Sequence, residues 1–340
     1  MTFAALTCPQ CAGPLPHQAL WRMIQCPYCG TSVTKHDNLV QRAWFKESLQ
    51  QVNAAAEHAA DALAELAASG SRVVSVENQR YRILAPLGGG VDSEVFLAQR
   101  ISPFPERVTL KLARTTTPAG ALARKATILQ ALQQIAIPGA SYFSQRLPQV
   151  VSVGAATDCF AASPGAEALV LRHPVGFWGS MADVLRYQPD GIDPRHAVWI
   201  WRRMLEVLAY IHDAGWMHGD ILPEHMLVQP KDHGILLIGW SRARKAAAQD
   251  QARDLQQTAW SLRCLLARQA DLANRDQAPL PGSHIPRDFA ICLTNASENR
   301  DWCQQLGAAG LLQEVGRAAR AAFGPAKFIH FHPDPRSTPI

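Results

Sequence analysis

The sequence predicts an α+β fold in which the strands come first along the chain and the helices follow. Six short runs rich in β-branched residues lie between residues 72 and 172, and leucine- and alanine-rich helical patterns accompany and follow them. Strands that precede helices, instead of alternating with them, are typical of α+β domains and not of βαβ units. The six predicted strands are Arg72–Val76, Tyr81–Leu87, Val95–Gln99, Val108–Ala113, Val150–Gly154 and Ala168–Arg172.

The size and composition of the chain predict more than one folded unit. At 340 residues it exceeds one typical domain, and 48% hydrophobic with 18% charged residues argues against disorder. The 33 lysine and arginine residues against 28 acidic residues give a net charge of +5, which is spread along the chain. Because a nucleic-acid interface needs clustered basic residues, nucleic acid is not an expected partner.

The chain carries no pattern for membrane insertion or secretion. A long stretch without a charged residue, Ala126–Gln145, contains four glutamines, two serines and a proline, so it would not partition into lipid. The segment before Cys8 has no basic residue and does not resemble a secretory signal. We therefore expect a cytoplasmic protein that does not interact with membranes.

Four cysteines near the start predict a structural zinc site. Cys8 and Cys11 form one Cys-x-x-Cys pair, and Cys26 and Cys29 form a second pair after fourteen intervening residues. Two such pairs supply the four thiolates of a tetrahedral Zn²⁺ site, and the site is closed because protein fills every position. A redox role is disfavoured because no thioredoxin-like βαβ pattern surrounds either pair. Residues 1–36 resemble a zinc ribbon, and residues 37–70, free of proline and glycine up to Gly70, are predicted to form a helical linker.

Further along the chain, several motifs follow one another in a recognisable order. A glycine-rich turn, Gly88-Gly89-Gly90, lies between two predicted strands, and Lys111 lies in the apolar strand after it. A helical pattern, 196–212, precedes His218-Gly219-Asp220, and a short apolar strand, 235–238, is followed by a helix expected to begin at Asp254. This order resembles the protein-kinase superfamily over roughly residues 78 to 266.

The resemblance implies a two-lobed fold and a nucleotide site. Residues 71–174 would form the strand-rich N-lobe, residues 175–330 the helical C-lobe and residues 331–340 a tail, with irregular chain beyond Leu266. ATP is then a candidate ligand. By the resemblance, Asp220 takes the place of the catalytic aspartate and Asp254 braces its loop, while His218 holds that loop through a backbone hydrogen bond. The residues that would bind the nucleotide are Gly88, Gly90, Ser93, Val95 and Lys111.

The sequence departs from the family where the family binds magnesium. The family uses an asparagine and an aspartate as oxygen ligands, and these positions hold His225 and Gly239. Magnesium strongly prefers oxygen ligands, so Mg²⁺ is not expected to bind in the family's manner. Glu224 could recruit a metal instead, although an exposed loop position is the favoured interpretation.

A second departure concerns the acid that pairs with the family's strand lysine. The helix that should supply it carries Lys125, and no acidic residue lies between Arg107 and Thr157. Glu94 could pair with Lys111, but a solvated strand end is the favoured interpretation for it.

These departures predict a pseudokinase that acts as a regulatory or scaffolding module. Protein partners are expected for the zinc ribbon and for the kinase-like domain, with ATP as a candidate ligand. The alternative is an active Ser/Thr-type phosphotransferase that uses Lys111 and Asp220 with unconventional metal ligation.

Overall fold

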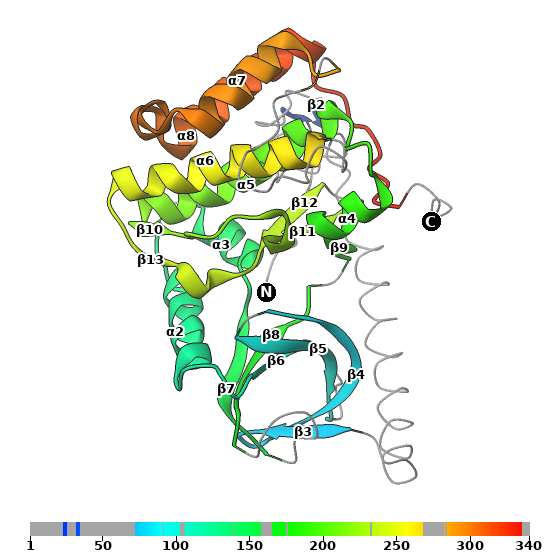
Figure 1. The fold of residues 1–340 in the computed structure, drawn as a ribbon, viewed down its shortest axis with the longest axis vertical. Coiled ribbons are helices and arrows are strands. Elements are labelled where there is room, and N and C mark those ends of the chain that lie inside the picture. Colours follow the sequence, from blue (N-terminus) through cyan, green and yellow to red (C-terminus); the bar gives the residue numbers. More distant parts are fainter. Residues whose placement is uncertain are drawn as a thin grey trace. The chain divides into compact units, whose positions relative to one another are not determined.

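The structure is a computed structural model. It describes residues 23–25, 32–34, 72–90, 92–102, 106–137, 139–157, 165–174, 176–231, 233–267, 282 and 284–334. The described chain divides into two compact units (Figure 1). The barrel unit holds the described residues of 72–131 and 148–174, and the helical unit holds those of 23–34, 132–147 and 176–334.

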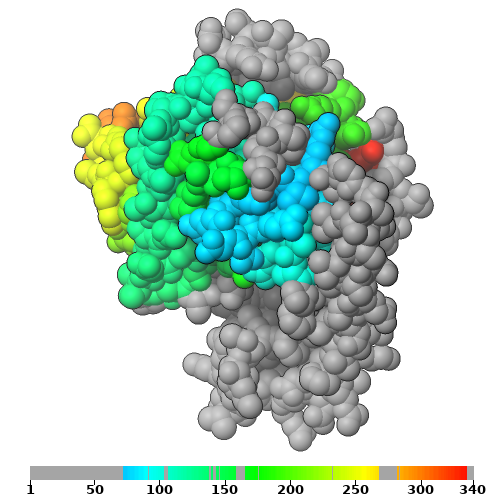
Figure 2. All heavy atoms as spheres, turned by 90° about the horizontal axis from the view of Figure 1, so that it is seen from below, coloured from blue at the N-terminus to red at the C-terminus, as the bar shows by residue number. Residues whose placement is uncertain are grey.

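The barrel unit is a closed antiparallel barrel with the strand order β3-β4-β5-β6-β8-β7. All six predicted strands are confirmed, and the first of them lie at the surface in light blue in Figure 2. Alternating buried residues such as Val108, Leu110 and Leu112 form the core, together with Tyr81. The strands are β3 (Val73–Val76), β4 (Gln79–Gly89), β5 (Ser93–Arg100), β6 (Arg107–Ala113), β7 (Val150–Thr157) and β8 (Glu167–Arg172).

Helix α2 (Ala121–Gln133) follows β6 and has no acidic residue in its first turn. The missing acid is supplied from the sheet, because the Glu167 carboxylate accepts hydrogen bonds from the backbone N–H groups of Leu122 (3.0 Å) and Ala123 (2.6 Å). This contact satisfies two of the unpaired amides at the helix start and fixes α2 on β8.

The helical unit is built around α5 (Pro194–Asp213) and α6 (Ala248–Leu266). The predicted helix 196–212 is confirmed as α5, and the predicted strand 235–238 as β12 (Gly234–Leu237). Strand β11 (Met226–Gln229) pairs with both β12 and β9 (Gly179–Ser180), while β10 (Trp216–Met217) pairs with β13 (Arg244–Lys245). The remaining short helices are α3 (Ala140–Phe143) and α4 (Met181–Tyr187).

Two expectations about the helical unit are wrong. Helix α6 begins at Ala248 and not at Asp254, because the residues from 248 to 253 are alanine, glutamine, aspartate and arginine, which a helix accommodates readily. The chain beyond Leu266 is not irregular throughout, since α7 (Arg287–Glu298) and α8 (Arg300–Phe323) occupy much of it. Helix α8 packs on both α5 and α6. It contains a kink at Gly307 (φ 61°), which divides the helix into two segments that do not share one continuous face.

The two tryptophans of α5 lie in different surroundings. Trp201 is fully buried, and its indole N–H donates to the Thr258 hydroxyl (2.9 Å). Trp199 stacks on His233 (4.4 Å between ring centroids) and meets Phe331 edge-on (5.7 Å). Trp199 therefore contacts the C-terminal segment through Phe331.

A short hairpin near the start of the chain is formed by β1 (Met23–Gln25) and β2 (Ser32–Thr34), which pair in the register Ile24 with Val33. In the sequence these strands flank the second cysteine pair. All four predicted zinc ligands, the linker 37–70 and the residues after Asp334 lie outside the described residues. No described helix has the length and hydropathy needed to cross a bilayer.

Candidate functional site

The register of the barrel strands brings the predicted nucleotide-binding residues together. Gly88 pairs with Val95, and Val95 pairs in turn with Lys111 on β6. The turn between β4 and β5 is closed by a hydrogen bond from the Gly90 N–H to the Ser93 carbonyl (2.9 Å). Gly88 has φ of 142°, a conformation that other residues rarely adopt, so glycine is required there.

The glycine-rich turn is tied to the segment that follows β6. The Arg114 guanidinium donates to the Gly90 carbonyl (2.9 Å), and the Arg114 backbone N–H donates to the Asp92 carbonyl (3.0 Å). The Thr117 hydroxyl donates to the same Asp92 carbonyl. These bonds fix the backbone of the turn.

Lys111 keeps some exposed surface, but its ammonium lies among protein atoms. Desolvation, together with the positive charge of Lys125, lowers the pKa of Lys111 to about 8, and the charge of Asp92 opposes this shift. The Lys111 ammonium makes no hydrogen bond or ion pair with any residue that the structure describes.

The acid missing from α2 is found on the glycine-rich turn. Lys125, at the helix position where the family carries its acid, forms an ion pair with Asp92 (Nζ to Oδ2 2.9 Å). The sequence pattern did not single out Asp92, because it lies on the turn before β5 and not on the helix where the family carries this acid. The alternative pairing of Glu94 with Lys111 is not observed, since Glu94 forms an exposed ion pair with Arg114 (3.3 Å).

The second part of the candidate site is the Asp220 loop of the helical unit. Asp254 on α6 is fully buried and accepts hydrogen bonds from the backbone N–H groups of His218 (2.7 Å) and Gly219 (2.8 Å). Its carboxylate also lies 3.0 Å from Nε2 of His212. The predicted brace is therefore present.

The hydrogen bonds of His218 define its protonation state. Its Nε2 lies 3.0 Å from the Ile238 carbonyl and must donate to it, while its Nδ1 accepts from the Asp220 N–H (3.2 Å). Both nitrogens are used by the neutral ring, and burial lowers the pKa of His218 to about 4. The predicted backbone hydrogen bond of His218 is thus confirmed, and the neutral ring orients Asp220.

Cationic and aromatic groups surround the Asp220 carboxylate. His225 Nδ1 donates to the Asp220 carbonyl (2.7 Å) and lies 3.6 Å from the Asp220 carboxylate. The Arg242 guanidinium approaches the other carboxylate oxygen at 3.9 Å. Glu224, the other metal ligand considered, is exposed, and no described group of three or more histidine, cysteine or acidic side chains is arranged to hold a metal.

The His225 ring lies so close to Gly239 that no side chain fits at position 239. A Cβ atom added to Gly239 would lie 2.6 Å from three atoms of the His225 ring, far inside van der Waals contact. The imidazole thus occupies the space into which a side chain at position 239 would project. These two positions do not fit Mg²⁺, because neither supplies an oxygen ligand.

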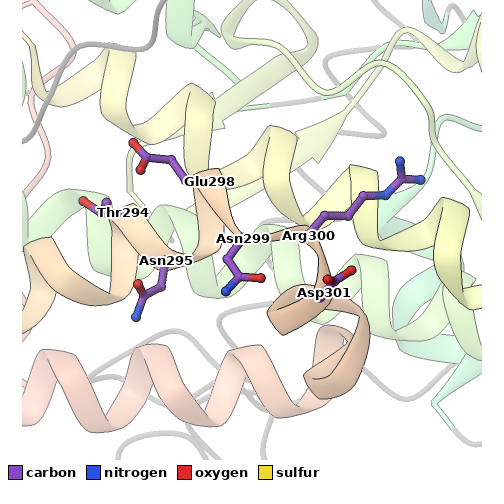
Figure 3. A pocket seen from close by; sticks show the side chains of 6 residues that line it. All are labelled: Thr294, Asn295, Glu298, Asn299, Arg300 and Asp301. Atoms are coloured by element: carbon purple, nitrogen blue, oxygen red, sulfur yellow. The ribbon is translucent and has the colours of Figure 1, made fainter.

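Two surface pockets lie away from the predicted site residues. A pocket of about 760 Å³ in the barrel unit is lined by Arg114, Thr117 and Glu167 among others. Another, of about 410 Å³, lies where α7 passes into α8 and is lined entirely by polar side chains (Figure 3). Its lining residues are Thr294, Asn295, Glu298, Asn299, Arg300 and Asp301.

Three buried thiols in the helical unit are inert. Burial raises the pKa of Cys264 to about 11 and those of Cys292 and Cys303 to about 12. All three are free cysteines, as expected of structural thiols.

Comparisons with known proteins agree with this geometry. A family model described as the lipopolysaccharide kinase (Kdo/WaaP) family matches residues 147–280, a range that contains the Asp220 loop and lacks Lys111. Among solved structures, the crystal structure of the BubR1 kinase domain is similar, with a TM-score of 0.53 at 12% sequence identity. The match covers 74% of this chain and 84% of that chain. A search of curated proteins gave no match. The predicted resemblance is confirmed at the level of the fold: this chain has a protein-kinase-like fold.

Proposed function

We propose that the protein is a pseudokinase that acts as a regulatory or scaffolding module. The observation that carries this proposal is the contact between His225 and Gly239. At the two positions where protein kinases hold magnesium, an imidazole ring and a glycine fill the space and offer no oxygen ligand.

The energetic consequence favours a loss of ordinary kinase chemistry. Phosphoryl transfer depends on positioning and on neutralising phosphate charge, and divalent metals supply much of that neutralisation. Without both ligands, several kcal/mol of transition-state stabilisation is lost, which is a rate decrease on the order of a thousandfold or more. His225 and Arg242 also lie close to the Asp220 carboxylate, at 3.6 Å and 3.9 Å.

Within this function, ATP is a candidate ligand and proteins are the expected partners. Lys111, Val95 and Gly88 adjoin one another in the barrel register, which supports a retained nucleotide site. The zinc ribbon, held by Cys8, Cys11, Cys26 and Cys29, would contribute a protein-binding surface, and the cytoplasm is the proposed location. The donor set is four thiolates, which suits structural Zn²⁺.

A thermal-shift titration with ATP, with and without Mg²⁺ or Mn²⁺, tests the proposal together with a phosphate-transfer assay. We expect stabilisation by ATP without transfer of the γ-phosphate. Metal-dependent stabilisation that Lys111→Ala abolishes, combined with phosphate transfer that Asp220→Ala abolishes, would overturn the pseudokinase proposal. An absence of any shift with ATP would leave a scaffold that does not bind nucleotide.

A second candidate function is an active phosphotransferase with unconventional metal ligation. It is favoured by the hydrogen bonds of Asp254 and His218, which hold the Asp220 loop as catalysis would need it. The matching family is described by its action on lipopolysaccharide, so a sugar hydroxyl joins serine and threonine as an acceptor to be assayed.

The zinc proposal has its own test. We expect one Zn²⁺ per chain by elemental analysis, and Cys26→Ser should lose it. Folded protein without zinc would contradict the proposal.

A further inference from the structure

Three charged side chains meet beside the glycine-rich turn, and their charges do not balance. Lys125 and Asp92 form an ion pair (2.9 Å), and Lys125 holds the pKa of Asp92 below its usual range. Lys111 interacts electrostatically with both of them but has no hydrogen-bonded partner among the described residues. One carboxylate is therefore bonded to Lys125 and acts on Lys111 only through its charge.

This arrangement favours an additional or a more highly charged anion. The Lys125 side chain is only 13% exposed, so the repulsion between the two lysines is weakly screened. A single carboxylate neutralises one of the two charges. A phosphate chain carries at least two negative charges and could neutralise both, with charge-assisted hydrogen bonds to each ammonium.

Asp92 can vacate its place without a change in the backbone of the turn. Its carbonyl is held by the Arg114 N–H and the Thr117 hydroxyl, and neither bond involves the carboxylate. The Asp92 side chain is 39% exposed, so rotation about its own bonds would carry the carboxylate into water. The ion pair is thus a removable contact on a fixed turn.

We propose that Lys111 and Lys125 together form a binding site for a phosphate chain, that Asp92 occupies this site as a tethered competing anion, and that binding there needs no divalent cation. The inference rests on the nucleotide-binding part of the proposed function and adds a second cation and a built-in competitor to it. Lys125 supplies positive charge that the missing metal ligands cannot recruit.

Isothermal titration of the full chain tests this inference with two ligands, ATP and inorganic tripolyphosphate, each in EDTA and in Mg²⁺. Asp92→Asn removes the competing charge and keeps the shape of the side chain, so we expect both ligands to bind about tenfold more tightly in EDTA. Lys125→Met should weaken binding about tenfold or more, whereas Lys125→Arg should retain it. Glu106→Gln removes an equal charge at the other end of the β5–β6 pair, where Glu106 contacts Arg172 (2.9 Å), and should change little.

The outcomes separate this inference from the proposed function. If ATP binds and Asp92→Asn leaves its affinity unchanged, or if binding requires Mg²⁺, the two-lysine site is refuted while nucleotide binding stands. If neither ligand binds the parent or Asp92→Asn, both proposals of phosphate binding fall. If Asp92→Asn raises the affinity for tripolyphosphate as well as for ATP, the phosphate chain is the recognised group. If it raises the affinity for ATP alone, the site recognises a nucleotide. Thermal unfolding of each variant shows whether it folds. If Lys125→Met does not fold, Asp92→Asn and Lys125→Arg still test the inference.

Discussion

The Asp220 loop and the glycine-rich turn depart from the protein-kinase pattern in opposite ways. Around Asp220 the groups that hold the backbone are present, namely Asp254 and His218, while the metal-binding positions are occupied by His225 and Gly239. Beside the glycine-rich turn, Lys111 is present on β6, and the acid Asp92 lies on the turn instead of on helix α2, where it pairs with Lys125.

The difference separates what the fold requires from what the chemistry requires. Buried amide N–H groups need acceptors in any folded protein, so the loss of Asp254 would cost stability whether or not the protein transfers phosphate. A metal ligand stabilises nothing once the metal is absent, so its position is free to change. A charged side chain falls between these two cases. An ammonium such as that of Lys111 still needs an anion near it, but the anion can come from any part of the chain.

The largest expected effect follows from removing Asp254. Asp254→Ala leaves two buried N–H donors without acceptors and removes the partner of His212, so the free energy of unfolding should fall by about 3–5 kcal/mol. Urea denaturation measures this. Asp250→Ala, on the same helix, is the control, because Asp250 pairs only with exposed arginines and its loss should cost less than about 1 kcal/mol. Equal losses in the two variants would show that Asp254 is not a brace.

The next effect is a loss of stability in acid. Burial lowers the pKa of His218 from 6.5 to about 4, so the unfolded chain takes up a proton below pH 6.5 that the folded chain does not accept until about pH 4. The free energy of unfolding should therefore fall between pH 6.5 and pH 4, by about 3 kcal/mol for this residue. His196 and His233, with pKa values lowered to about 4 by burial, add to the loss in the same range.

Denaturation at a series of pH values checks this sign and range. In His218→Phe the dependence on pH should be shallower than in the parent, because one of the contributing rings is absent. Identical slopes for the two proteins would mean that His218 is not held neutral.

A smaller effect tests the altered metal positions. Gly239→Asp should destabilise the protein by about 2 kcal/mol, because its Cβ meets the His225 ring at 2.6 Å. In a His225→Asn background the same change should cost at least about 1 kcal/mol less, as a double-mutant cycle would measure. The double variant also regains two oxygen ligands, so Mg²⁺ should raise its melting temperature and leave that of the parent unchanged. An equal cost in both backgrounds would contradict the contact.

Local patterns predicted the individual strands, although not their closure into a barrel. The six strands follow from β-branched runs, and the brace from Asp254 follows from the resemblance, because these features have fixed places along the chain. Helices α7 and α8 were missed. In α8, glycine at 307 and 310 interrupts the apolar pattern that signals a helix.

The contacts that decide function could not be predicted in the same way. Lys125 and Asp92 are 33 residues apart, and only the closure of the barrel with α2 brings them together. His225 and Gly239 meet because β11 and β12 pair as a hairpin, a register that the identities of the two residues do not specify. The sequence showed that the family's residues were replaced, but the structure was needed to see what the replacements contact.

The smallest expected effect concerns the tether of the glycine-rich turn. Arg114→Ala removes exposed hydrogen bonds to Gly90 and Glu94, so the free energy of unfolding should fall by less than about 1 kcal/mol. Hydrogen exchange at the amides of the turn should nevertheless become faster, because the carbonyl of Gly90 loses its anchor. Arg172→Ala, which removes a similarly exposed ion pair with Glu106, should leave exchange in the turn unchanged. If Arg114→Ala also leaves hydrogen exchange in the turn unchanged, the turn is held by its strands alone. The contrast with the buried Asp254 brace would then be greater, because the Arg114 side chain would contribute neither stability nor order to the turn.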